Sequence, residues 1–498
     1  MPESQLFRTK SIDALIATSE EPENRLAKTL GPWQLIALGV GAVIGSGIFI
    51  LTGTAAAGEV KEYSSIMNAT ILEIIASGGS VTSVGRPGGG PGIALSFLLV
   101  AVACGLAALC YAELASMIPI AGSAYTYAYA TLGEIFAWIV GWQLVLEYAV
   151  SNMAVAVGFA AHMNDVLDRF GWRLPEVISQ PTIQNGIITP HINLASFLIL
   201  IALTWLLVRG VKEGTNANNF MVIFKVTVIL LFIAVGSTHI QVENWNPIFP
   251  NGMNGLLTGA AIVFFTYIGF DSVSTAAEEC RRPQRDLPIG IMASLVICAL
   301  LYCGVAIVLT GMQNWKTLNN AAPVVNALKQ VGENNVRWFV GIGALFGMVS
   351  SLLVFQYGQS RIRYAMSRDG LLPKLFSKVH PRYRTPYVAT WIAGFVVGIP
   401  AMFGDIGAFA DLANMGTLCA FAMVSAGVLV LRKKQPERPR GFRVPLVPFI
   451  PILAIACCVL LMLSLPLFTW LNFLVWMTLG LLIYFGYSKS RSLLGRAE

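Results

Sequence analysis

One lysine lies in the middle of a long apolar stretch and is the residue of this sequence that most requires a chemical explanation. Lys225 occupies the segment NNFMVIFKVTVILLF. A lysine at the centre of a membrane-spanning helix costs about 2.5–3.5 kcal/mol on insertion scales, so it needs a partner or a neutral state. The preceding loop is about ten residues, or about 15 Å, away, too far for the side chain to reach water easily. Because loss of water disfavours the charged ammonium, we interpret Lys225 as a proton carrier, with a structural role as the alternative.

Acidic and histidine side chains are the other residues that could take part in proton or metal chemistry. Glu147 lies inside the third apolar segment, and we assign it a role in proton coupling beside Lys225. The run from Glu278 to Asp286 alternates in sign and is interpreted as an inner gate or a hydrated ion-pair cluster. The histidines at 162, 191, 239 and 380 are predicted in loops or at segment ends, so no metal site, cofactor or enzymatic centre is expected.

Small residues interrupt two apolar segments at mid-depth. Residues 39–49 read GVGAVIGSGIF, and residues 259–272 read GAAIVFFTYIGFDS. Opening a helix there leaves backbone N–H and C=O groups without helical partners, which a membrane interior tolerates only where a ligand or water replaces them. Glycines that merely allow close packing are the alternative. Two breaks at matching positions in two halves favour the substrate site of an inverted-repeat transporter.

An amino acid zwitterion can satisfy both kinds of freed backbone group. Its carboxylate would accept from amides near Ser46 and Gly47, at the positive amino end of a half-helix. Its ammonium would donate to carbonyls of both breaks. The backbone residues predicted to bind substrate are Val43, Ile44, Gly45, Ser46, Gly47, Phe265, Thr266 and Ile268.

Long apolar helices are needed to position these residues, and the composition predicts them. The 498 residues are 56% hydrophobic and 12% charged, against about a quarter charged in a soluble chain. The apolar residues gather in blocks of about 18 to 25, the length of a membrane-spanning helix and too long for barrel strands. The predicted spans are 33–56, 92–117, 125–158, 193–209, 214–236, 253–278, 288–311, 336–360, 387–404, 407–431, 446–466 and 469–487.

The positions of the basic residues predict the orientation. If both termini are cytoplasmic, most of the 33 Lys and Arg residues fall in inner segments, as the positive-inside rule requires. The net charge of +7 is therefore a topology signal, and nucleic-acid binding is not expected. The first 30 residues lack an apolar core, so a cleaved signal peptide is not expected either. The predicted location is the cell membrane.

Residues 58–91, between the first two spans, depart from this pattern. The stretch contains a β-branched run followed by the Gly-rich GRPGGGPG. Its apolar part, about residues 66–76, is too short to span a membrane. We predict an insertion that either packs on the outer surface or stays mobile.

Four motifs are similar to a known family. GAVIGSGIF, FFTYIGFDSVSTAAEECRRPQRDLP, GLLPKLFSKVHPRYRTPYVA and RPRGFRVPLVP resemble bacterial members of the cationic amino acid transporter family, within the amino acid–polyamine–organocation superfamily. The resemblance implies two inverted five-helix repeats followed by two extra helices, with discontinuous helices 1 and 6. It also implies that Phe265 covers the bound substrate and that Lys225 occupies the place of a cation that bridges spans one and eight in sodium-driven relatives. Ser350 and Ser351 would face that place.

The sequence therefore predicts an all-α polytopic membrane protein with twelve transmembrane helices. Its parts are a cytoplasmic segment (1–32), a first repeat (33–236), a second repeat (237–431) and a final part with spans 11 and 12 (432–498). The predicted function is proton-coupled symport of L-amino acids by alternating access. The partners are the amino acid, protons and the lipid bilayer, with a sterol or a small membrane protein left open.

Substrate preference is predicted from one face of span eight. Ser351 and Phe355 are four residues apart and share a helix face, so Phe355 would shorten a side-chain pocket there. Because no carboxylate is placed to meet a second positive charge, small or medium neutral amino acids such as alanine are favoured. The alternatives are transport of arginine or lysine, and amino acid or polyamine exchange.

Overall fold

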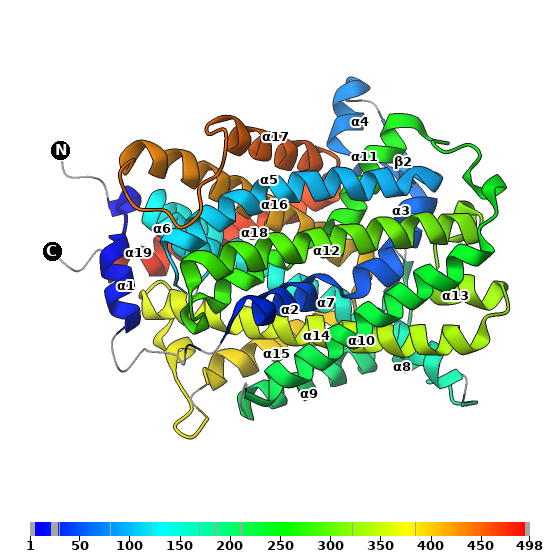
Figure 1. Cartoon of the computed structure of the whole chain (residues 1–498), viewed down its shortest axis with the longest axis horizontal. Coiled ribbons are helices and arrows are strands. Elements are labelled where there is room, and N and C mark those ends of the chain that lie inside the picture. Colours follow the sequence, from blue (N-terminus) through cyan, green and yellow to red (C-terminus); the bar gives the residue numbers. More distant parts are fainter. Residues whose placement is uncertain are drawn as a thin grey trace.

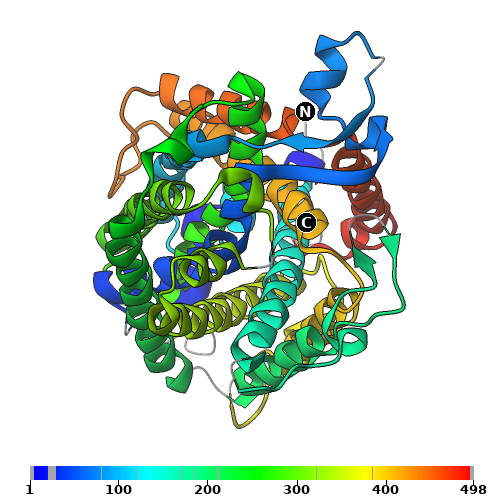
Figure 2. The same cartoon turned by 90° about the vertical axis from the view of Figure 1, so that its right-hand side faces the viewer.

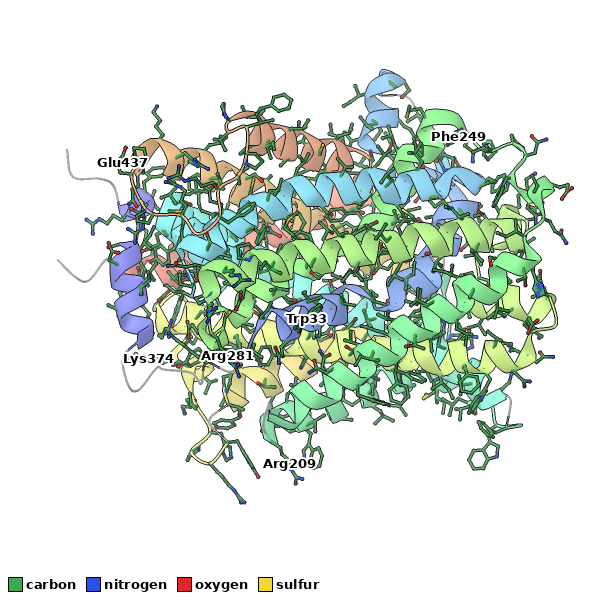
Figure 3. All side chains as sticks on the ribbon, viewed as in Figure 1. Trp33, Arg209, Phe249, Arg281, Lys374 and Glu437 are labelled. Atoms are coloured by element: carbon green, nitrogen blue, oxygen red, sulfur yellow. The ribbon has the colours of Figure 1, made fainter. Side chains whose placement is uncertain are left out.

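The fold is a bundle of long helices that run side by side along one axis (Figure 1). The computed structural model describes residues 5–493 except 21–27, 29, 80, 121, 169, 185–186, 210–211, 321 and 384. Helices α1 (Ile12–Glu20) and α19 (Lys489–Arg491) lie at the same end of the bundle, here called the termini end (Figure 1). The labelled charged side chains Arg281, Lys374 and Glu437 lie toward this end, whereas Phe249 lies toward the opposite end (Figure 3).

The described residues contain eight helical segments that are long and apolar enough to cross a membrane; one of them, Gly252–Glu279, combines an α-helix with two 3-10 helices. A ninth candidate is a pair, α2 (Pro32–Val43) and Gly47–Ala57, that bends by 44° at its break. Three apolar helices are shorter: α9 (Leu194–Arg209), α15 (Tyr387–Ala401) and α17 (Phe449–Leu463). Each predicted segment therefore coincides with helix, which confirms an all-α polytopic membrane protein. The exact number of twelve spans stays a prediction.

The longer helices pack against one another in a few extensive pairs. Helix α5 packs along α12, and α7 packs along both α14 and α16. The bounds of the remaining helices are α5 (Ile93–Met117), α6 (Ala124–Thr131), α7 (Glu134–Asp168), α8 (Glu176–Ser179), α10 (Lys212–Gly236), α11 (Gly252–Val263), α12 (Pro283–Met312), α13 (Pro323–Gln330), α14 (Asn334–Arg368), α16 (Ile406–Lys434) and α18 (Leu467–Ile483).

Two predicted boundaries are wrong. The third span, predicted over 125–158, is divided into α6 and α7 at Gly133, which has φ +110° and so suits only glycine. A Cβ there would lie 2.7 Å from the backbone of Phe7. Helix α7 also continues to Asp168, so His162 is buried within a helix instead of lying at a segment end.

Residues 58–79 and 81–91 include a β-hairpin. Strand β1 (Gly58–Ser65) pairs antiparallel with β2 (Ser83–Pro87), and the hairpin crosses the end of the bundle that faces the viewer in Figure 2. We call this end the hairpin end. Along the chain, helix α4 (Ile71–Ala76) belongs to the connection between the two strands, and it begins with a capping box of Thr70 and Glu73. The amide of Leu467, which begins α18, donates to the carbonyl of Ala69 at 2.9 Å. Of the two predicted alternatives, the structure supports packing on the surface.

Candidate functional site

The first candidate element is the break between α2 and the helix that follows it. Helix α2 ends at Val43, and Ile44 is extended with ψ 90°. The amide of Gly45 then donates back to the carbonyl of Val43 at 3.0 Å. The chain resumes as the π-helix η2 (Gly47–Leu51), which continues into α3 (Thr52–Ala57). The predicted interruption is confirmed, and it leaves carbonyls at the end of α2 without helical donors.

The second candidate element follows α11. After Val263 the chain forms the 3-10 helix η7 (Phe264–Tyr267), passes through an extended Ile268, and forms a second 3-10 helix, η8 (Phe270–Glu279). Gly269 connects them with φ +120°. A Cβ at Gly269 would lie 2.9 Å from the Cβ of Ala42. The glycine therefore provides both the backbone conformation and the close approach to α2.

The two breaks lie against each other in the interior. A Cβ at Gly47 would lie 2.7 Å from Cγ2 of Thr266 and 3.0 Å from its Cα. Ser46, Phe265, Thr266 and Ile268 are all buried. The structure thus brings together the residues that the sequence assigned to one site from segments more than 200 positions apart.

Lys225 caps the carbonyl end of α2. Its Nζ donates to the carbonyl oxygens of Gly41 and Ile44, each at 2.8 Å. The side chain is fully buried, and no ion pair joins it to a carboxylate among the residues that the structure describes. Carbonyls at a helix carboxyl end carry partial negative charge, so they stabilise a cation there. The lysine therefore sits where protonation changes the hydrogen bonding of the first break.

Two serines of α14 complete this cap. Ser351 Oγ lies 3.0–3.1 Å from the carbonyl oxygens of Gly41, Ala42 and Ile44. Ser350 Oγ donates to Oδ1 of Asn218 at 2.7 Å. Span eight thus touches the first break, as the resemblance predicted for these serines.

The two other predicted site residues, Phe355 and Glu147, lie apart from this cap. Phe355 is buried and packs edge-on against Tyr148, with ring centroids 5.7 Å apart. Glu147 is buried on α7, and neither carboxylate oxygen has a hydrogen-bond partner in the described chain. No hydrogen bond or ion pair among the described residues joins Glu147 to Lys225. The assignment of both residues to the site stays a prediction.

The prediction missed a tyrosine that contacts both breaks. The hydroxyl oxygen of Tyr302, on α12, lies 2.9 Å from the carbonyl oxygen of Val43 and 2.9 Å from that of Thr266. A tyrosine in the middle of an apolar span needs a partner for its hydroxyl. This requirement could have drawn attention to Tyr302 in the sequence, but it does not show which groups the hydroxyl contacts.

The site also has an unsatisfied donor and a neighbouring cavity. Ser46 Oγ is fully buried and has no hydrogen-bond partner in the described chain. A cavity of about 80 Å³ lies between α2, α10, η8 and α14, with Gln34, Asn218 and Tyr357 in its wall. Because Asn218 also contacts Ser350, the cavity borders the polar groups around Lys225.

This arrangement is suited to a small molecule that carries both donors and acceptors. The carbonyls of the breaks offer acceptors, and the amides at the start of η2 offer donors at a helix amino end. The described residues contain no group of three or more His, Cys, Asp or Glu side chains suited to a metal ion.

Comparison with known proteins identifies relatives along the whole chain. Residues 30–486 match the family model described as amino acid permease. The chain is 43% identical over 494 residues to the methylthioribose transporter of Bacillus subtilis (strain 168), covering 99% of this chain and 100% of that protein. It is 44% identical over 493 residues to the branched-chain amino acid permease BcaP of the same organism, covering 99% of each. It is 36% identical over 441 residues to the vacuolar cationic amino acid transporter 4 of Arabidopsis thaliana, covering 87% of this chain and 68% of that one.

Proposed function

Because the chain belongs to the amino acid permease family, we propose that it is a proton-coupled symporter of L-amino acids in the cell membrane. The observation that carries the proposal is the pair of 2.8 Å contacts from Lys225 Nζ to the carbonyls of Gly41 and Ile44. These contacts link a group that can bind a proton to the backbone that shapes the first break.

Binding of the amino acid uses the backbone of both breaks. The substrate carboxylate accepts from the amides near Ser46 and Gly47, and its ammonium donates to carbonyls near Val43, Phe265, Thr266 and Ile268. Proton binding at Lys225 strengthens its bonds to the end of α2 and so holds the first break in the shape that receives the substrate. Phe265 closes over the substrate, and Glu147 serves as a second proton acceptor.

Transport then requires that the site open alternately to the two sides. In the proposed movement, spans 1, 2, 6 and 7 rock against spans 3, 4, 5, 8, 9 and 10, within repeats formed by residues 33–236 and 237–431. Both termini face the cytoplasm, so the hairpin end faces outward. Basic side chains such as Arg281 and Lys374, which lie toward the termini end (Figure 3), support this orientation.

Small or medium neutral amino acids are the favoured substrates. Phe355 is buried on the α14 face that carries Ser351, and it limits the length of a side chain on that face. The branched-chain permease among the relatives is consistent with an aliphatic substrate. Arginine or lysine transport, and exchange of amino acids or polyamines, are the alternatives, which the cationic amino acid transporter relatives keep open.

A second candidate substrate is methylthioribose, favoured by the 43% identity to a transporter of that name over 99% of this chain. This molecule is an uncharged thioether sugar, so its hydroxyl groups, instead of an ammonium and a carboxylate, would meet the backbone of the breaks. The two candidates therefore differ in the charge of the ligand.

Uptake into proteoliposomes tests the proposal. Purified protein should accumulate labelled L-alanine or L-leucine when the outside is acidic and sodium is absent. Uptake only into vesicles preloaded with amino acid indicates exchange, and a strict sodium requirement contradicts proton coupling. Competition by methylthioribose, arginine, lysine and putrescine separates the substrate alternatives. Empty vesicles are the control, and uptake no greater than theirs would contradict the proposed transport.

A further inference from the structure

Tyr302 joins the two broken helices through one hydroxyl group. The residue is fully buried on α12. Its oxygen lies 2.9 Å from the carbonyl oxygen of Val43, the last residue of α2, and 2.9 Å from that of Thr266 in η7. No other described side chain is hydrogen-bonded to carbonyls of both breaks.

The hydroxyl has one proton for two carbonyls. It can donate to only one of them at a time, while its own oxygen can still accept a hydrogen bond. Three acceptor oxygens therefore meet at a buried point where the donors are this one hydroxyl and the amide of Gly45, which donates to the carbonyl of Val43 at 3.0 Å. Such a point favours a ligand group that has several N–H donors and a positive charge.

The aromatic ring is fixed, so only the proton of the hydroxyl can reorient. Its centroid lies 5.6 Å from that of Phe97 and 5.2 Å from that of Tyr267. These are ordinary distances for packed aromatic pairs. The oxygen therefore stays between the two breaks while its proton turns from one carbonyl to the other.

We propose that Tyr302 is a substrate-positioning residue whose hydroxyl holds the Val43 and Thr266 carbonyls at the spacing that receives the substrate ammonium. This inference rests on the proposed amino acid transport and assigns the ammonium subsite within it. When the amino acid binds, its N–H groups take over one carbonyl and the hydroxyl keeps the other. The two breaks are thereby joined through Tyr302 and the substrate together.

The test compares Tyr302→Phe with Tyr484→Phe by calorimetric titration of L-alanine and L-leucine into purified protein. Tyr484 is a matched control because it is also fully buried, but it lies outside both breaks and its hydroxyl donates to Oε1 of Glu134 at 3.0 Å. We expect the Kd to rise at least tenfold in Tyr302→Phe and less than threefold in Tyr484→Phe.

A second measurement separates positioning from a general structural effect. N-methyl-L-alanine lacks one N–H donor, so its Kd should exceed that of L-alanine by a larger factor in the wild type than in Tyr302→Phe. If Tyr302→Phe fails to fold, 2,3-difluorotyrosine at position 302 retains the hydroxyl but makes it a stronger donor to the two carbonyls, so it competes with the substrate ammonium for them and should also weaken binding. Unchanged affinities in the Tyr302 variants overturn the inference, whereas a wild type that binds no amino acid contradicts the proposed function instead.

An independent observation concerns a buried ion-pair group at the hairpin end. Arg86, on β2, is 4% exposed. Its Nε and Nη2 donate to Oε2 of Glu59 on β1, at 3.1 and 2.6 Å, and its Nη1 donates to Oδ1 of Asp411 on α16, at 2.9 Å. Lys61 Nζ lies 2.5 Å from the other oxygen of Glu59. We call Glu59, Lys61, Arg86 and Asp411 the hairpin clasp.

The clasp connects parts of the chain that alternating access would separate. The hairpin directly continues α3, beyond the first break, and leads into α5, whereas Asp411 belongs to α16. Removing one partner of a buried ion pair leaves the other charge uncompensated, which costs more than loss of an exposed pair. The bond from Arg86 to Asp411 therefore opposes any movement of α3 away from α16.

We infer that the hairpin clasp holds the site closed at the hairpin end and must release Asp411 when that end opens. The test is hydrogen–deuterium exchange of the full-length protein without substrate, comparing Asp411→Asn with the wild type. We expect at least tenfold faster exchange in α3 and in the hairpin, with partial restoration in Asp411→Glu. The control is Asp13→Asn, which removes an exposed ion pair with Arg438 at the termini end. Faster exchange confined to the hairpin strands, with α3 unchanged, would show a local structural role and overturn the inference.

Discussion

Replacement of Lys225 by methionine provides the strongest test of the coupling argument. Methionine keeps most of the side-chain volume but removes both donors to Gly41 and Ile44. A hydrogen bond from a charged group contributes about 2 kcal/mol and a neutral one about 1 kcal/mol. Two such bonds therefore change by about 2 kcal/mol when Lys225 loses its proton, which corresponds to about a 30-fold change in an equilibrium constant.

The expected result is a loss of pH dependence in substrate binding. If protonated Lys225 holds the binding shape of the first break, wild-type affinity for L-alanine should strengthen by up to about 30-fold as pH falls through the titration of the lysine. The affinity of Lys225→Met should change less than about threefold over the same range. The measurement is calorimetric titration at a series of pH values, with Lys329→Met as the control because Lys329 is exposed on α13.

Uptake measurements extend this test to coupling. A symporter that moves one proton with each amino acid can accumulate substrate about tenfold for each unit of pH gradient, since one unit corresponds to about 1.4 kcal/mol. Lys225→Met should still exchange labelled for unlabelled substrate but should not accumulate it. If the variant keeps the full pH dependence and still accumulates substrate, Lys225 has no part in coupling and the reasoning is refuted.

Three further predictions concern the breaks, the side-chain pocket and the hairpin clasp. Gly47→Ala should cost about 1–3 kcal/mol in substrate binding, because the added Cβ meets Thr266. The control Gly486→Ala adds a methyl group in open space. Equal calorimetric affinities in the two variants would contradict the close approach of Gly47 to Thr266. Phe355→Ser should extend competition of uptake to longer side chains, and an unchanged competition profile would remove Phe355 from the pocket. Burial opposes ionisation of Glu59, but the charges of Arg86 and Lys61 outweigh it and hold the pKa of Glu59 at about 2, below its ordinary 4.5. Its ionised form thus stabilises the fold above about pH 4.5, and this stabilisation is lost as the pH falls toward 2. Glu59→Gln should lower the melting temperature at pH 7 without moving the pH profile of uptake between about 5.5 and 7.5. A moved profile would implicate Glu59 in coupling.

The sequence was sufficient to predict the helices and the two breaks, because both depend on local properties of the chain. Apolar length predicts a spanning helix, and glycine beside small polar residues predicts a place where it opens. The depth of Lys225 followed from its apolar neighbours. Its carbonyl partners did not, because they depend on how α2 ends and where α10 lies beside it.

The contacts of Tyr302 and the hairpin clasp were beyond sequence reasoning for a different reason. Arg86 and Asp411 are separated by 325 positions, and nothing local indicates that a loop arginine pairs with a residue of a span. Tyr302 is one of 14 tyrosines, and its chemistry depends on two carbonyls contributed by other helices. Pairings of this kind are set by tertiary packing, for which a single sequence has no periodic signal.

The 3-10 helix η8 gives the segment beyond the second break an adjustable length. A 3-10 helix rises about 2.0 Å per residue and an α-helix about 1.5 Å, so the 10 residues of η8 would shorten by about 5 Å on conversion to α-helix. Its ends are held at Gly269, against α2, and at Cys280, which pairs with Leu30 in a short β-bridge. Because Ala42 and Leu30 lie at opposite ends of α2, a change of winding in η8 would have to shift η8 along α2 or release one of these two contacts.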